Sequence, residues 1–119
     1  MSPPVSTLPA DVADFIASAR VGRLATADGA GQPLVVPICY AWDGEALVSA
    51  IDAKPKRAGE LARVRNIREN PKVSVVIDKY DEDWRRLRWV IIQGLAEVLT
   101  AGSDFAAGVD LLLSKYPQY

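Results

Sequence analysis

Basic residues are concentrated in one part of this chain, where they could bind an anion. Positions 54–72 hold seven lysines and arginines and only two glutamates, which gives this segment a charge of +5 in a chain of net charge −1. Three of these cations, Lys54, Lys56 and Arg57, precede a segment (58–70) in which apolar residues recur at helical spacing. Because the free N–H groups of a helix N-terminus also favour an anion, we expect this loop to bind phosphate. The alternative is a solvated charged helix face.

A second candidate is the apolar run Leu34 to Tyr40, which contains a proline at position 37. Proline cannot donate a hydrogen bond to a β-ladder, so Pro37 predicts a sheet edge or a bulge. A planar aromatic ligand could lie against such a strand and bind its free main-chain groups. The alternative is a core strand with an edge proline.

A third candidate is a cluster of aromatic residues and arginines near position 85. Its members are Tyr80, Trp84, Arg85, Arg86, Arg88 and Trp89. Such a cluster could stack nucleic-acid bases, cover a cofactor through cation–π contacts, or line a subunit interface. The interface is the commonest use of this composition.

The composition excludes several kinds of chemistry. The chain has no histidine, which rules out histidine-dependent triads, histidine zinc sites and histidine-ligated haem. Its single cysteine, Cys39, cannot form an intramolecular disulfide, so we expect a small buried apolar residue in a reducing, cytoplasmic setting. No segment resembles a secretion signal or a membrane span. The net charge of −1 argues against a nucleic-acid partner.

The hydrophobic pattern predicts a single domain over residues 1–119 that opens with a helix and continues mainly as antiparallel strands. An Asp43-Gly44 pair between two apolar runs is typical of a hairpin turn, and Gly94 inside a strand suggests a bulge or a close backbone approach. Ser6 or Thr7 is the expected cap of the first helix. The expected helices cover 9–20, 58–70 and 103–115, and the expected strands cover 21–27, 33–42, 45–51, 72–79 and 89–99.

The order of these pieces resembles the pyridoxamine 5'-phosphate oxidase-like split-barrel family, and within it the class that uses the deazaflavin coenzyme F420. The resemblance lies in the runs 19–26, 33–38, 54–57, 66–73, 78–80, 84–90 and 93–94, and it spans nearly the whole chain. It implies a six-stranded antiparallel split β-barrel with flanking helices, and a homodimer with two cofactor sites at the interface. Members of that class usually continue past a segment like 116–119 into a final strand, so we expect an open barrel edge if none follows.

The resemblance also implies which residues bind the cofactor. Val36, Pro37 and Ile38 would line the ring system, Ser49, Ala50 and Ile51 would lie beside the ribityl chain, and Lys54, Lys56 and Arg57 would bind phosphate. Trp84 and Arg88 would come from the partner subunit.

The implied activity is hydride transfer between the deazaflavin and a small unsaturated organic substrate. Arg63 and Arg65 could hold the glutamate tail of the deazaflavin, although the basic segment would also accept FMN. The proton donor stays open between Tyr40, Tyr80 and water. A cofactor-binding protein without catalysis, and a nucleic-acid binder whose affinity falls steeply with salt, are the two alternatives from other classes.

Overall fold

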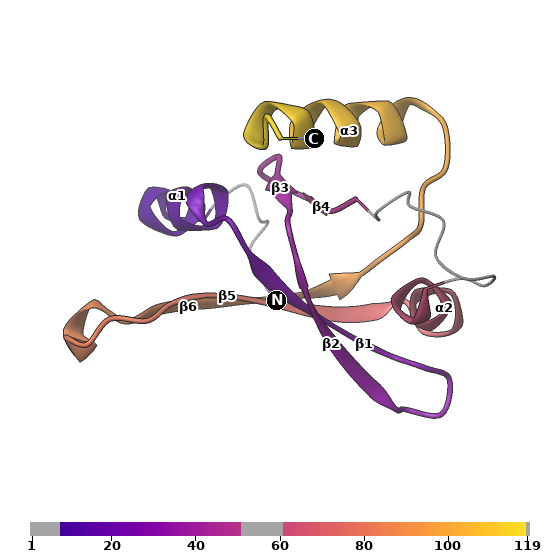
Figure 1. Cartoon of the computed structure of the whole chain (residues 1–119), viewed down its shortest axis with the longest axis horizontal. Coiled ribbons are helices and arrows are strands. Elements are labelled where there is room, and N and C mark those ends of the chain that lie inside the picture. The colour runs from indigo at the N-terminus through magenta and orange to yellow at the C-terminus, as the bar shows by residue number, and fades with distance from the viewer. Residues whose placement is uncertain (1–7, 51–60, 119) are drawn as a thin grey trace.

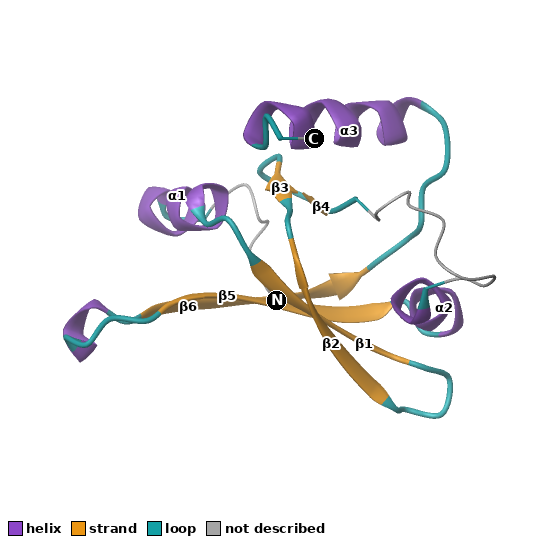
Figure 2. Cartoon of the chain, viewed as in Figure 1, coloured by secondary structure: helices purple, strands orange, loops and turns teal. Residues whose placement is uncertain are grey.

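Three α-helices and two antiparallel sheets form the described part of the chain, residues 8–50 and 61–118 of a computed structural model (Figures 1 and 2). The helices are α1 (Ala10–Ser18), α2 (Ala62–Glu69) and α3 (Ser103–Lys115), with a short 3-10 helix η2 (Trp84–Arg86). The strands are β1 (Gly22–Ala27), β2 (Pro33–Ile38), β3 (Ala41–Trp42), β4 (Leu47–Val48), β5 (Lys72–Lys79) and β6 (Arg88–Leu95).

The strands are antiparallel as expected, but they do not close into the expected six-stranded barrel. The larger sheet has the order β2-β1-β5-β6, and β3 and β4 form a separate pair. With two residues each, β3 and β4 are too short to connect the larger sheet's edges, so β2 and β6 stay edge strands among the described residues. The α+β class is therefore confirmed for the described residues, whereas the closed barrel is not.

The predicted elements match the structure closely in the middle and at the end of the chain. The expected strand 72–79 and the expected helix 103–115 coincide with β5 and α3. The expected cap of the first helix is wrong, because α1 begins at Ala10 with Pro9 at the N-cap position. Ser6 and Thr7 themselves lie outside the described residues. Proline suits the start of a helix, since the first N–H groups have no partner within the helix.

The Asp43-Gly44 pair forms the predicted hairpin turn between β3 and β4. The Asp43 carboxylate accepts hydrogen bonds from the Glu45 and Ala46 N–H groups, both at 2.7 Å, and these bonds hold its pKa below the usual value. Gly44 adopts a φ of 102°, which other residues rarely tolerate. The strands it joins are shorter than expected, but the turn itself is confirmed.

The main core lies between α1 and one face of the larger sheet. Phe15 and Ile16 of α1 pack on Ile38, Val75 and Ile77. Each such buried side chain contributes about 1.5–3 kcal/mol to folding. A second, smaller cluster joins the C-terminal end of α3 to β3 and contains Ala41, Leu112 and Tyr116. In Figure 1, α1 and α3 lie on the same side of the larger sheet.

No described helix covers the other face of this sheet. Register places Val35 of β2 on that face together with three residues of β6, and all four are large, apolar and more than half exposed. The three are Trp89, Ile91 and Leu95. We call this surface the uncovered face.

The β5–β6 hairpin forms an arm that extends past α1 to one end of the molecule, with η2 at its tip (Figures 1 and 2). All eight residues of β5 pair in register with β6, including Val73 with Gly94. The expected bulge at Gly94 is therefore wrong, and no described atom lies within 4 Å of where its Cβ would be. Among the described helices, none is long and apolar enough to cross a bilayer.

Candidate cofactor site

The strand predicted to line a ring system, β2, is an edge strand of the larger sheet. It pairs with β1 over all six residues, and no described strand pairs with its other side. Pro37 is exposed on the uncovered face, opposite Arg23 of β1. The prediction that Pro37 marks a sheet edge is therefore confirmed.

The side chains of Val36 and Ile38 point to the other face of the sheet. Ile38 is only 6% exposed and belongs to the main core, and Val36 packs against the same cluster. A ligand at this edge would meet the β2 main chain and Pro37, and it would not meet the side chain of Ile38. Of the three predicted ring-binding residues, only Pro37 has an exposed side chain.

Ser49 and Ala50 follow β4 and are exposed next to the end of β2. The Ser49 hydroxyl donates a hydrogen bond to the Cys39 carbonyl oxygen at 2.7 Å, so the β3–β4 hairpin folds back on the residue that follows β2. Ile51, Lys54, Lys56 and Arg57 lie outside the described residues. The phosphate loop thus stays a prediction. Ser49 and Ala50 are the last described residues before it, and the Ser49 hydrogen bond holds them at the end of β2.

Helix α2 follows this segment in sequence, and a buried hydrogen bond attaches it to the larger sheet. The Asn66 side-chain amide donates to the Thr26 hydroxyl of β1 at 3.0 Å, and both residues are less than 9% exposed. No acidic residue lies in the first turn of α2, so nothing on the helix itself neutralises its N-terminal dipole. The charge of this helix start suits an anion.

Trp84 and Arg88 lie at the opposite edge of the sheet from β2. Trp84 belongs to the tip of the β5–β6 arm and Arg88 is the first residue of β6. In the order β2-β1-β5-β6, three strand spacings, on the order of 14 Å, separate the two edges. Within one chain the structure therefore does not bring Trp84 and Arg88 together with Val36, Pro37 and Ile38.

The Arg88 guanidinium is held by its own chain. It lies over the Phe15 ring at 5.0 Å and 3.9 Å from the Asp11 carboxylate of α1. Its contact with Phe15 places it on the helix-covered side of the arm.

A shallow groove of about 420 Å³ lies beside Arg23, where the arm leaves the sheet. Its lining residues are Arg23, Val76, Asp78, Lys79, Tyr80, Leu87, Arg88 and Trp89. Arg23 and Asp78 form an ion pair at 2.6 Å within it. The sequence does not predict this groove, because no local pattern pairs β1 with β5, and that pairing places Arg23 near Asp78.

One predicted proton donor is excluded by its surroundings. Tyr40 is fully buried, its hydroxyl donates to the Ile16 carbonyl oxygen, and burial raises its pKa to about 12. A ligand at the surface cannot reach this proton. Tyr80, directly after β5, is 62% exposed and stays available.

Cys39 is half-buried, which is less than expected, and packs beside the smaller core cluster. The described residues contain no group of histidine, cysteine, aspartate and glutamate side chains that could hold a metal ion.

A family model for pyridoxamine 5'-phosphate oxidase matches residues 8–119, nearly the entire chain. The chain belongs to this family. The matched range includes both the β2 edge and the β5–β6 arm.

The chain is 30% identical over 89 residues to a 5a,11a-dehydrotetracycline/5a,11a-dehydrooxytetracycline reductase of Streptomyces rimosus; the match covers 74% of this chain and 61% of the reductase. The chain therefore matches less than two thirds of the length of this relative.

Solved structures with a similar fold include a FAD-binding protein, an F420 reductase and a haem-binding protein. A FAD-binding protein of Mesorhizobium loti is 30% identical with a TM-score of 0.67, covering 90% of this chain and 72% of that one. An F420 reductase is 26% identical with a TM-score of 0.64, covering 92% and 79%. A haem-binding protein of Mycobacterium smegmatis is 25% identical with a TM-score of 0.68, covering 98% and 45%.

Proposed function

We propose that this chain binds the deazaflavin coenzyme F420 at the β2 edge and reduces a small unsaturated organic substrate by hydride transfer. The observation that carries the proposal is the Ser49 hydrogen bond to Cys39. It brings the residues before the basic segment to the end of an edge strand whose outer side no described strand covers. A ring at that strand and a phosphate at that segment are thus compatible with one ligand.

The described residues fit such a cofactor through their main chain. The outer edge of β2 offers N–H and C=O groups without a described strand partner, and these groups can bind the polar edge of a ring. Pro37 offers an exposed apolar surface beside them. Val36 and Ile38 would support the strand from the core side, and Lys54, Lys56 and Arg57 would hold the phosphate.

When bound, a deazaflavin supplies the hydride chemistry, so the protein need only position it, stabilise charge and exclude water. Main-chain N–H groups of β2 can stabilise negative charge that develops on a ring beside them. With Tyr40 buried, Tyr80 of the partner subunit or water would deliver a proton. Because the cofactor would supply the hydride chemistry, the chain needs no histidine for it.

We further propose that the site is completed in a homodimer. Trp84 and Arg88 lie at the opposite sheet edge from β2, so one chain cannot use all the proposed residues in one site. The uncovered face, with Val35, Trp89, Ile91 and Leu95, offers the apolar area that a stable subunit contact needs.

FMN is the alternative cofactor, and a cofactor-binding protein without catalysis is the alternative function. The latter is favoured by one observation, namely that Tyr40 is out of reach as an acid. Haem is a weaker candidate, because the chain offers no histidine ligand.

Titration of the purified protein with F420, FMN and haem, each followed by fluorescence or absorbance, tests the cofactor. We expect saturable binding of F420 that is tighter than that of FMN. Binding of FMN alone would change the cofactor, binding of haem alone would contradict the proposal, and binding without turnover of enones, quinones and nitro compounds would favour the non-catalytic alternative.

A further inference from the structure

The tip of the β5–β6 arm carries an unusually exposed tryptophan on an ordered turn. Trp84 is 74% exposed, the highest value for an aromatic side chain among the described residues. Tyr80, directly after β5, and Trp89, the second residue of β6, are also more than 60% exposed. Exposed tryptophans in such a setting are typical anchors of protein interfaces.

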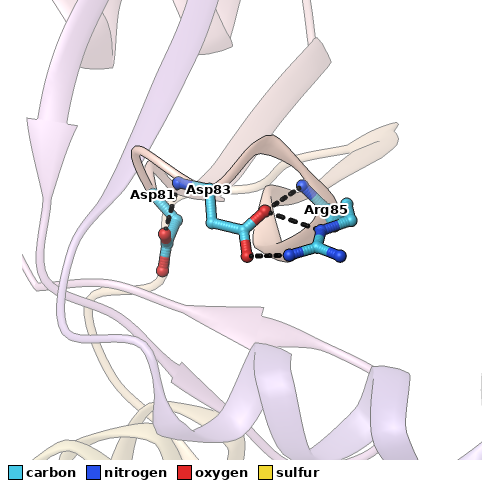
Figure 3. A network of polar contacts seen from close by, with 3 residues as sticks. All are labelled: Asp81, Asp83 and Arg85. Atoms are coloured by element: carbon cyan, nitrogen blue, oxygen red, sulfur yellow. Dashed lines mark hydrogen bonds and ion pairs between the residues drawn. The ribbon is translucent and has the colours of Figure 1, made fainter.

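Two aspartates fix the backbone on both sides of this tryptophan (Figure 3). Asp81 accepts a hydrogen bond from the Asp83 N–H at 2.8 Å, and Asp83 accepts one from the Arg85 N–H at 3.1 Å. The Arg85 guanidinium also donates to both carboxylate oxygens of Asp83, at 3.0 Å each. Asp81 thus holds the residue before Trp84, and Asp83 holds the residue after it.

The backbone of η2 is closed by two further bonds. The Arg86 N–H donates to the Asp83 carbonyl oxygen at 2.8 Å, and the Leu87 N–H donates to the Trp84 carbonyl oxygen at 3.3 Å. A turn of three residues lacks the cooperative support of a longer helix, so its shape depends on its capping groups. Asp83 is the capping residue of η2.

The exposed ion pair between Asp83 and Arg85 contributes little to global stability. Side-chain fixation of a loop does matter for binding, because a binding conformation populated only part of the time weakens the apparent affinity by that fraction. The tip combines an exposed aromatic anchor, Trp84, with a turn whose backbone is already fixed.

We propose that Asp81 and Asp83 are positioning residues that preset the arm tip, so that Trp84 docks at the β2-edge site of a second copy of this chain. This inference rests on the proposed function, which places Trp84 at the site of a partner subunit. It adds the residues that determine how Trp84 is presented. Because β2 and β6, a strand of the arm, are opposite edges of one sheet, Trp84 does not lie at the β2 edge of its own chain. The β2 edge at which it docks therefore belongs to a second copy.

A double-mutant cycle tests the inference, with F420 affinity and the dimer dissociation constant as readouts. We expect Asp83→Ala to weaken F420 binding and dimerisation, each on the order of fivefold. Asn caps a helix as well as Asp does, so Asp83→Asn should keep affinity within about twofold although it removes the same charge. Glu82→Gln is the matched control, because Glu82 receives only the Tyr80 hydroxyl, at 3.4 Å.

The double variant that combines Asp83→Ala with Trp84→Ala gives the decisive result. If Asp83 acts through Trp84, Asp83→Ala adds nothing in the Trp84→Ala background. Additive effects, or a loss equal in Asp83→Asn and Asp83→Ala, would overturn the positioning role. A 19F spectrum of protein labelled with 5-fluorotryptophan, with Trp84 assigned by Trp84→Phe, should show its resonance shifted in Asp83→Ala and unmoved in Glu82→Gln.

The outcomes also separate this inference from the proposed function. If Trp84→Ala weakens F420 binding and Asp83→Ala does not, the positioning role is wrong and the proposed function stands. If the unmodified protein binds no F420, the proposed function fails, and the inference fails with it.

Discussion

The Tyr116 hydroxyl bridges the end of α3 to the Tyr40 main chain. It accepts a hydrogen bond from the Tyr40 N–H at 3.2 Å and lies 3.0 Å from the Tyr40 carbonyl oxygen and 2.8 Å from that of Arg20. One hydroxyl therefore joins three segments that are distant in sequence. It fixes α3 over the β2–β3 connection, next to the Cys39 carbonyl that Ser49 binds.

Removing this hydroxyl should destabilise the fold. Tyr116→Phe leaves the buried Tyr40 N–H without this partner, so we expect a loss of about 1–3 kcal/mol in the free energy of unfolding. Urea denaturation measures it. Tyr80→Phe is the control, since Tyr80 is 62% exposed, and should change stability by less than about 0.5 kcal/mol. Equal stability of Tyr116→Phe and the unmodified protein would contradict the role of the hydroxyl.

The buried bond between Asn66 and Thr26 should determine how firmly α2 is held. Thr26→Val keeps the shape of the side chain but removes the acceptor of the Asn66 amide, and we expect a cost of about 1–3 kcal/mol. Thr26→Ser keeps the hydroxyl and should cost less. Hydrogen exchange of the α2 amides should rise in Thr26→Val; an unchanged exchange rate would show that other contacts hold the helix.

Tyr40 should weaken the protein at high pH. Its pKa is raised from 10.0 to about 12 in the folded state, so the folded state keeps a proton that the unfolded state loses. The stability linked to this proton is complete below pH 10 and is lost as pH rises from about 10 to 12. Unfolding by urea across this range should show falling stability, with a shallower fall in Tyr40→Phe. Equal slopes would contradict a buried neutral Tyr40.

Two glycines should respond in opposite ways to an added methyl group. A Cβ at Gly22 would lie 3.2 Å from Val75 Cγ1 and 3.4 Å from the Tyr40 ring, so Gly22→Ala should cost about 1–3 kcal/mol by overpacking. A Cβ at Gly94 would meet no described atom, and Gly94→Ala should be neutral or slightly stabilising. Thermal unfolding compares the two, and an equal effect would contradict the packing described at Gly22.

Local patterns in the sequence predicted most elements, whereas pairings between distant segments could not be predicted from it. A run rich in β-branched residues located β5, and the Asp43-Gly44 pair located the hairpin turn, because both signals lie within a few residues. The predicted bulge at Gly94 is wrong, since a glycine in a regular strand looks the same in sequence as one in a bulge. The groove at Arg23 needs the β1–β5 pairing, which no local pattern encodes.

In the candidate site, too, local features could be predicted from the sequence and tertiary contacts could not. Pro37 predicted a sheet edge from its own chemistry, and the edge is present. That Ile38 faces the core depends on which side α1 packs, and the burial of Tyr40 depends on contacts with α1 and α3. Such contacts follow from tertiary packing, so the sequence alone left Tyr40 among the candidate acids.

The proposed cofactor site can be tested by the affinity of the protein for F420 with and without the predicted phosphate-binding cations. Fluorescence titrations would compare the unmodified protein with Lys56→Ala, Arg57→Ala and the control Lys72→Ala, which removes an exposed cation from the start of β5. We expect each of the first two to weaken binding about tenfold or more, as loss of a charged hydrogen bond does, and Lys72→Ala to leave it unchanged. Equal affinity in all four proteins would contradict the proposed site.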